Sequence, residues 1–259
     1  MYLCTKIVPK MNFDHHRYKF IVKNSINSTN SCAKELILSK KCNDRTVIVA
    51  ENQTQGRGQH TDIWESEEGK NLTFSIVYFP KCIPASDQFY LSRAIALGVA
   101  DYLAGNVDEV SIKWPNDIYV GDKKIAGILI ENTIVGPYIA STICGIGINI
   151  NQEVFCSNAP NPISLKQITG GVYVLSNELE ILIKAIENRY QHLEKRDFNK
   201  LESDYMNVLY RKEGYYPFSE EGMIFIAKIA EITDMGQMVL EKKNGERKAY
   251  SFKEVSYVL

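Results

Sequence analysis

Two short motifs carry the residues with the clearest chemical potential in this chain. Gln-Thr-Gln-Gly-Arg-Gly occupies residues 53–58, and Lys-Trp-Pro-Asn-Asp occupies residues 113–117. Glycines on either side of Arg57 allow the backbone to turn tightly and to direct amide N–H groups toward an anion. In the second motif, Lys113 adds an ammonium group next to amide and carboxylate side chains. Together the two motifs predict a site for a small anionic ligand.

The remaining motifs narrow the chemistry that such a site could perform. The sequence has neither a Walker phosphate loop nor a Gly-x-Ser-x-Gly nucleophile elbow. Residues 145–149 open like a dinucleotide fingerprint, but they lack the third glycine and lie in an apolar run. A site built from Arg57, Lys113 and backbone amides suits a reaction between two anions, such as the attack of a carboxylate on the α-phosphate of ATP. Fixed cations there would reduce repulsion and stabilise the developing charge.

Each of these residues has an ordinary explanation when it is considered alone. A lone arginine in a loop and a lone lysine at a strand end are usually solvated. Ser28-Thr29-Asn30 by itself predicts only a helix N-cap. Their joint occurrence with Gln53 and Trp64 favours a site. The polar stretch 52–70 is long for a structureless loop. We expect it to close over the acyl-adenylate that a carboxylate would form with ATP, because such a compound is prone to hydrolysis.

The motifs lie between elements of a mixed α and β domain. Apolar and alternating runs predict strands at 46–51, 72–79, 110–114, 124–131 and 138–149. Helical periodicity predicts helices from about residue 29, over 86–103, from 176 to about 193, and then to about 210. After Gly214, several short strands with turns at 234–236 and 243–245 predict a small β-barrel. We therefore expect a catalytic domain at 1–213 and a barrel at 214–259.

Composition and charge exclude several classes of protein. The formal net charge is −1, so the chain lacks the global basic field of a non-specific nucleic-acid binder. No signal-peptide pattern and no apolar run long enough to span a bilayer is present, and we expect a cytoplasmic protein without membrane contact. The six cysteines form no Cys-x-x-Cys pair and are expected to be free thiols. Metal binding at the adjacent His15-His16 is not favoured, because neighbouring side chains point apart in a strand.

Seven motifs occur in the order in which biotin protein ligases carry them, and from about Ser28 to Asn149 the chain resembles that family. The motifs are Ser28-Thr29-Asn30, residues 51–58, Trp64, residues 69–72, residues 113–117, residues 124–129 and residues 145–149. The order of the predicted elements continues the resemblance to the C-terminus. Several separate motifs in sequence make the match specific, which no single one of them would be.

The resemblance implies an α+β fold with a class II synthetase-like mixed sheet flanked by helices, followed by an SH3-like β-barrel. The implied activity has two steps. Biotin and ATP give biotinyl-5′-AMP and pyrophosphate, with Mg²⁺ expected on the phosphates. A lysine of a biotin carboxyl carrier protein domain then takes the biotinyl group.

The resemblance also assigns site residues, position by position. Arg57 and Lys113 are the catalytic candidates, and Lys113 is the first choice for the catalytic cation. Contacts with biotin or its adenylate are implied for Ser28, Thr29, Asn30, Gln53, Gly56, Arg57, Gly58, Gln59 and Lys113. Weaker candidates for the adenylate are Trp64, Asn116, Lys124 and Asn149.

Two departures and several alternatives remain. Many family members have a second arginine where this chain has Gln59, which affects how strongly the loop would retain the intermediate. About 27 residues precede the first motif, too few for a winged helix-turn-helix, so no DNA binding is expected. A lipoate ligase or octanoyltransferase and a biotin sensor without turnover are the rival functions. The oligomeric state stays open, with a homodimer among the alternatives.

Overall fold

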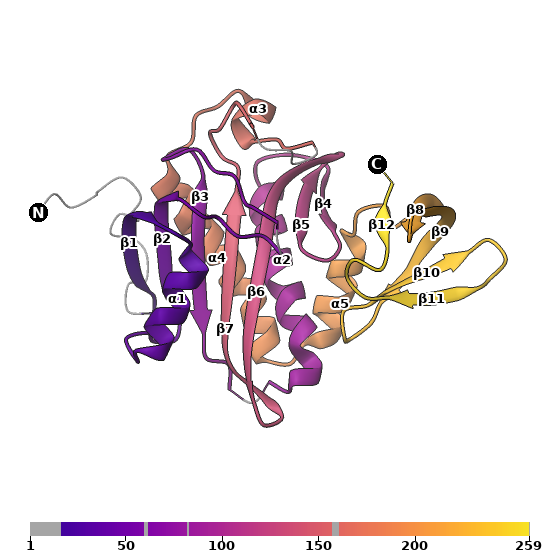
Figure 1. Ribbon diagram of the computed structural model, residues 1–259, viewed down its shortest axis with the longest axis horizontal. Coiled ribbons are helices and arrows are strands. Elements are labelled where there is room, and N and C mark those ends of the chain that lie inside the picture. Colours follow the sequence, from indigo (N-terminus) through magenta and orange to yellow (C-terminus); the bar gives the residue numbers. More distant parts are fainter. Residues whose placement is uncertain (1–16, 60–61, 82, 157–160, 259) are drawn as a thin grey trace, which may run out of the picture.

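The central element is a seven-stranded mixed sheet with helices on both faces (Figure 1). A computed structural model describes residues 17–59, 62–81, 83–156 and 161–258. The strand order is β1-β2-β3-β7-β6-β5-β4, in which only the β1–β2 pair is parallel. The strands are β1 (Lys19–Ile26), β2 (Thr46–Gln53), β3 (Leu72–Tyr78), β4 (Val110–Lys113), β5 (Asp117–Val120), β6 (Lys123–Val135) and β7 (Tyr138–Ile148).

The two faces of the sheet are covered unequally. On one face, α1 (Thr29–Leu38) packs through Ala33 on Ile48, Val77 and Ile143. The other face carries the main core, where alternate strand residues such as Val47 meet the long helices. α1 covers only one part of its face, and residues of β6 and β7 beyond it line a cavity. The remaining helical elements are η1 (Ala85–Asp87), α2 (Gln88–Ala104), α3 (Leu165–Thr169), α4 (Leu175–Glu194) and α5 (Phe198–Asn207).

A second, five-stranded antiparallel sheet follows α5 and lies beside β4 in Figure 1. Its order is β11-β10-β9-β8-β12, formed by β8 (Tyr216–Glu220), β9 (Met223–Ile232), β10 (Met238–Lys242), β11 (Arg247–Tyr250) and β12 (Ser256–Tyr257). The fully buried Arg93 of α2 donates from Nη2 to the carbonyl of Ile232 at 2.5 Å. Tyr90 donates to Asp234 at 2.6 Å, and the Trp114 indole donates to the carbonyl of Gly236 at 2.9 Å. These bonds fix the β9–β10 turn to α2 and to the residue after β4.

Most predicted elements are confirmed, with corrections at their ends. The predicted turns at 234–236 and 243–245 both lie between paired strands. The N-cap of the long helix is Val174, two residues before the predicted Ser176, and the helix begins at Leu175. Four elements were not predicted from the sequence: β1 and the shorter β5, β8 and α3. The continuous strand β9 was predicted as two strands.

Four of the six cysteines lie within the described residues. Cys32, Cys42, Cys144 and Cys156 are free, as predicted. Cys4, Cys82 and the His15-His16 pair lie outside the described residues. Within the described ranges, no group of three or more His, Cys, Asp or Glu side chains could hold a metal ion. None of the described helices combines the length and the apolar character that a bilayer crossing requires.

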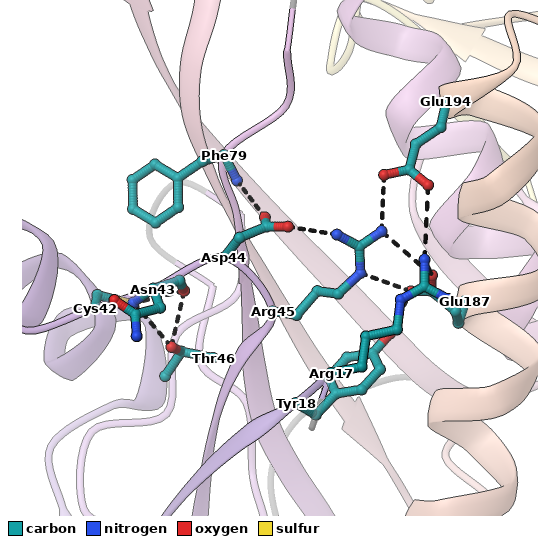
Figure 2. Close-up of polar contacts among 10 residues, drawn as sticks. All are labelled: Arg17, Tyr18, Cys42, Asn43, Asp44, Arg45, Thr46, Phe79, Glu187 and Glu194. Carbon is teal, nitrogen blue, oxygen red and sulfur yellow. Dashed lines mark hydrogen bonds and ion pairs between the residues drawn. The ribbon is translucent and has the colours of Figure 1, made fainter. Parts of the chain in front are cut away.

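A buried ionic network ties β2 to α4 at the side of the sheet away from the C-terminal strands (Figure 2). Glu187 of α4 accepts from the Arg45 Nε at 3.2 Å, from Arg17 at 2.6 Å, and from the Tyr18 hydroxyl. The side chains of Arg45 and Glu187 are only 10% and 9% exposed, whereas that of Glu194, which also binds Arg45, is 43% exposed. Burial makes the loss of one partner costly, because the other charge is left poorly compensated.

We therefore expect Glu187→Gln to reduce the free energy of unfolding by about 3 kcal/mol. The matched variant Glu194→Gln, on the same helix and bound to the same arginine, should cost less than about 1 kcal/mol because its carboxylate is exposed. Urea unfolding of both variants at neutral pH measures the difference. Equal losses would show that burial of Glu187 does not set its contribution.

Candidate active site

A cavity of about 470 Å³ lies against β6 and β7 in the middle of the sheet. Its walls come from the start of α1, the loop after β2, the ends of β4 and β5, and the last strand of the C-terminal sheet. Cationic side chains outnumber carboxylates along it, which favours an anionic ligand. The cationic residues that line it are Arg57, Lys113, Lys124 and Lys253, and the acidic ones are Asp62 and Asp117.

The floor of the cavity depends on glycines in two neighbouring strands. A Cβ at Gly147 would lie 2.3 Å from the Trp64 ring, and one at Gly127 would lie 3.1 Å from the same ring. A Cβ at Gly145 would lie 2.3 Å from the Asn30 amide oxygen. Side chains at these positions would therefore displace the groups that now rest on the sheet. The Gly-x-Gly run that imitates a nucleotide fingerprint instead makes room for Trp64 and Asn30.

The loop after β2 is held down by its own backbone. Trp64 donates its amide N–H to the carbonyl of Gly56 at 3.0 Å, and Gly58 donates to the carbonyl of Asp62 at 2.7 Å. A Cβ at Gly56 would meet the Trp64 carbonyl at 2.3 Å. Gly56 thus allows the loop to pack closely against Trp64. The amide of Gly58 joins the two sides of the loop through its hydrogen bond to Asp62.

The start of α1 forms a polar wall rather than a capped helix end. Ser28 occupies the N-cap position, but its side chain makes no capping hydrogen bond. The Thr29 amide and hydroxyl instead both lie within hydrogen-bond distance of the Gln53 Oε1, at 2.7 and 3.1 Å. The Ser75 hydroxyl lies 2.7 Å from Thr29 Oγ1 and 2.6 Å from Asn30 Oδ1. Because Oε1 is occupied, Gln53 turns its amide nitrogen toward other partners.

Arg57 reaches the cavity as half of an ion pair. Its guanidinium lies 3.1 Å from the Glu131 carboxylate of β6, and the two side chains are 46% and 32% exposed. The Asn30 Nδ2 donates to the other oxygen of Glu131 at 2.7 Å. Glu131 thereby links the loop arginine to α1 and to the sheet. At this exposure the pair adds little stability, so it can open at small cost when an anion competes for Arg57.

Lys113 lies at the opposite wall in a less polar environment. Its ammonium group donates to the Tyr119 hydroxyl at 2.9 Å and lies over the rings of Tyr119 and Tyr257, 4.7 and 5.2 Å from their centroids. Burial lowers the pKa of Lys113, and Asp117 acts in the opposite direction. Asp117 itself pairs with Lys124 at 2.7 Å.

The structure brings most of the sequence-predicted residues to this cavity. Arg57 and Lys113, from separate parts of the chain, both line it, together with Ser28, Thr29, Asn30, Gln53, Gly58, Gln59, Trp64, Asn116 and Lys124. Gly56 and Asn149 are not among the lining residues. Asn149 instead donates its side-chain amide to the carbonyl of Ile163 at 3.0 Å, which anchors the chain after β7.

Sequence reasoning missed three groups at the site. Glu131, the partner of Arg57, is one acidic residue in an ordinary alternating strand. Tyr119 lies in the strand that periodicity did not reveal, although its position two residues after the Lys-Trp-Pro-Asn-Asp motif was a signal for proximity. Tyr257 is 144 residues from Lys113, so no local pattern could have joined them.

Comparison with known proteins shows which family the chain is similar to. Residues 22–149 match the model of the Biotin/lipoate A/B protein ligase family. The bifunctional ligase/repressor BirA of Bacillus spizizenii is 29% identical over 237 residues, which cover 89% of this chain and 72% of that protein. A biotin–[acetyl-CoA-carboxylase] ligase of Paracoccus denitrificans is 30% identical over 177 residues, 66% of this chain and 72% of the relative. The solved structure of the Aquifex aeolicus biotin protein ligase in complex with biotin and ATP has 25% identity and a TM-score of 0.77, covering 92% of this chain and 97% of that one.

The fold and the cavity define a ligase of the class II synthetase-like type, and the predicted α+β fold class is confirmed. The relatives described above narrow this class further, because their names all include a ligase activity and two of them are named as biotin ligases. The chain belongs to the Biotin/lipoate A/B protein ligase family, among its biotin protein ligases.

The glycine floor makes a testable prediction. Gly147→Ala should push the Trp64 indole off β7, which would shift its fluorescence emission to longer wavelength and cost about 1–3 kcal/mol of stability. Gly127→Ala should give a smaller shift, because its Cβ would need only a slight movement of the ring. The other tryptophan, Trp114, is buried and bonded to Gly236, so it provides a constant background. An unchanged emission spectrum in Gly147→Ala would contradict the close approach of Trp64 to the sheet.

Proposed function

We propose that this chain activates biotin with ATP to biotinyl-5′-AMP and then transfers the biotinyl group to a lysine of a biotin carboxyl carrier protein domain. The observation that carries the proposal is the meeting of Arg57 and Lys113 at one cavity that also has a neutral polar wall. Its relatives support the choice of substrate, since the Aquifex aeolicus ligase was solved with biotin and ATP and the Paracoccus denitrificans protein is a biotin–[acetyl-CoA-carboxylase] ligase.

The polar wall suits the ureido ring of biotin, which needs neutral hydrogen-bond partners. Ser28 has a hydroxyl that is not used for capping, and Gln53 has an amide nitrogen that can donate. The Asn30 amide is satisfied at both ends by Ser75 and Glu131. We therefore assign Asn30 to holding the wall, and Ser28 and Gln53 to contacting the ring.

The first step joins two anions. A carboxylate oxygen of biotin attacks the α-phosphorus of ATP, the bond from that phosphorus to the bridging oxygen breaks, and pyrophosphate leaves. Lys113, whose contacts are with the hydroxyl and rings of tyrosines, keeps its charge available to the substrates at this point. Arg57 would exchange Glu131 for the carboxylate or the phosphate. Both cations then stabilise the charge that develops as the oxygens approach.

Magnesium is expected with the nucleotide rather than in a protein cage. Mg²⁺ usually binds through phosphates and one or two carboxylates, and it would neutralise charge on the leaving pyrophosphate. Asp62 and Asp117 line the cavity, and Asp117 is already paired with Lys124. Asp62 is therefore the better candidate for such a contact.

In the second step, the unprotonated amine of the carrier lysine attacks the biotinyl carbonyl carbon. The carbon–oxygen bond to the phosphate breaks, AMP leaves, and the amine loses a proton as the amide forms. The domain boundary near residue 213, the carrier as partner and the cytoplasmic location belong to the same proposal. The change of sheet between α5 and β8 supports that boundary.

The proposal is tested by pyrophosphate release with ATP, Mg²⁺ and either biotin or lipoate. We expect release with biotin, followed by a gain of one biotinyl group on a carrier domain detected by mass. Release with lipoate alone would identify a lipoate ligase. Tight biotin binding with no release would identify a sensor without turnover.

The Lys113→Ala variant tests the catalytic assignment. Loss of this cation should slow adenylate formation by a factor of about 10²–10³, which is typical for the loss of one charge-stabilising donor. The fold should persist, because a strand-end lysine contributes little to stability. Single-turnover pyrophosphate release measures the effect, with Lys123→Ala as the matched control, because Lys123 is exposed and outside the cavity. An unchanged rate in Lys113→Ala would remove this residue from its role.

A further inference from the structure

The ammonium group of Lys113 is enclosed by aromatic side chains from two different domains. Tyr119 belongs to β5 of the main sheet, and its hydroxyl accepts the lysine hydrogen bond at 2.9 Å. Tyr257 belongs to β12, the last strand of the chain, and its ring centroid lies 5.2 Å from the same nitrogen. A cation over a tyrosine face within about 6 Å is attracted by the ring quadrupole, more strongly when water is excluded.

The position of Tyr257 is fixed by contacts on several sides. Its ring packs on Phe218 and Tyr210, with centroids 5.2 and 5.8 Å away, and its strand pairs with β8. Arg211 donates to the carbonyl of Val258 at 2.8 Å, immediately after Tyr257. The end of the chain is therefore anchored beside the cavity.

A second contact joins the same part of the catalytic motif to the C-terminal sheet. Trp114, the residue after Lys113, donates to the carbonyl of Gly236 in the β9–β10 turn. Hydrogen bonds from Arg93 and Tyr90 of α2 hold the same β9–β10 turn in place. The C-terminal sheet thus contacts two successive residues, the ammonium group of Lys113 and the indole of Trp114.

We propose that Tyr119 and Tyr257 are positioning residues for Lys113, so that the last strand of the C-terminal sheet sets where the catalytic ammonium stands during adenylate formation. The inference rests on the proposed function of Lys113. Tyr119 limits the direction of the ammonium through a hydrogen bond, and Tyr257 closes the side that faces the C-terminal sheet. A lysine with four rotatable bonds would otherwise sample many positions, and ordering it in advance lowers the cost of reaching the transition state.

Burial and the charged neighbours together set the direction in which the pKa of Lys113 is shifted. Asp117 favours the charged form of Lys113, whereas Lys124 and Arg211 disfavour it. Burial is the largest influence and lowers its pKa. The Tyr119 hydroxyl opposes burial by accepting a hydrogen bond from the ammonium. Its removal should therefore lower the pKa of Lys113 further, and activity that needs the ammonium should decline at a lower pH.

Three variants test the enclosure by single-turnover pyrophosphate release with biotin, ATP and Mg²⁺. Tyr257→Leu removes the ring face and should lower the maximal rate about tenfold, equivalent to about 1.4 kcal/mol, with the KM for biotin within about twofold. Tyr257→Phe keeps the ring and should recover most of that rate. Tyr119→Phe keeps the packing but removes the acceptor, and the alkaline limb of its pH–rate profile should move to lower pH.

Phe218→Leu is the matched structural control, because Phe218 is buried against Tyr257 but does not line the cavity. It should lower the melting temperature and reduce the maximal rate less than Tyr257→Leu does, because Tyr210, the pairing with β8 and the Arg211 hydrogen bond still hold Tyr257, and it should leave the alkaline limb as in the wild type. The inference is overturned if Phe218→Leu loses as much rate as Tyr257→Leu, or if Tyr119→Phe keeps the wild-type alkaline limb. If Tyr257→Leu does not fold, the pH profile of Tyr119→Phe decides. A wild-type protein that releases no pyrophosphate with biotin would instead overturn the proposed function.

Discussion

The absence of side chains at a few positions of the central sheet is the constraint from which the site follows. At Gly145 and Gly147 of β7 the strand surface is bare, so Asn30 and Trp64 rest directly on the backbone. Both groups belong to segments that line the cavity, the start of α1 and the loop after β2. A methyl group at either glycine would lift one of these segments and widen the cavity. The shape of the site is therefore set by close packing, and the polar contacts are arranged on that surface.

The cations of the cavity are held in two different ways, and the difference bears on their roles. Arg57 and Lys124 are each paired with a carboxylate, so part of their field is already neutralised. Lys113 is held by a hydroxyl and by aromatic faces, which orient an ammonium without cancelling its charge. Partial burial also reduces the screening of that charge by water. These features favour Lys113 for stabilising a transition state, and they suit Arg57 for a contact that changes when ligand arrives.

The sequence predicted the parts of the site that are encoded locally. The Gly56–Gly58 loop, the Ser28–Asn30 segment and the end of β4 could each be recognised, because turn residues, cap residues and strand runs leave short-range patterns. Elements of four or five residues, such as β5 and β8, leave too few periods to be distinguished from loops. The pairings of Arg57 with Glu131 and of Lys113 with Tyr257 join residues 74 and 144 positions apart. Such pairings depend on strand order and domain packing, which single-sequence periodicity does not contain.

The junction between the two sheets explains why the small C-terminal sheet can influence a cavity on the larger sheet. A buried arginine in α2 is costly unless it is compensated, and Arg93 donates from Nη2 to the carbonyls of Ile232 and Thr233, while its Nη1 lies 3.8 Å from the Asp234 carboxylate. Removing the C-terminal sheet would therefore expose apolar surface on α2 and leave a buried charge without these partners. The same junction places Trp114 and Tyr257 beside Lys113. Stability and the geometry of the site consequently depend on one interface, so a change that loosens this interface should affect both.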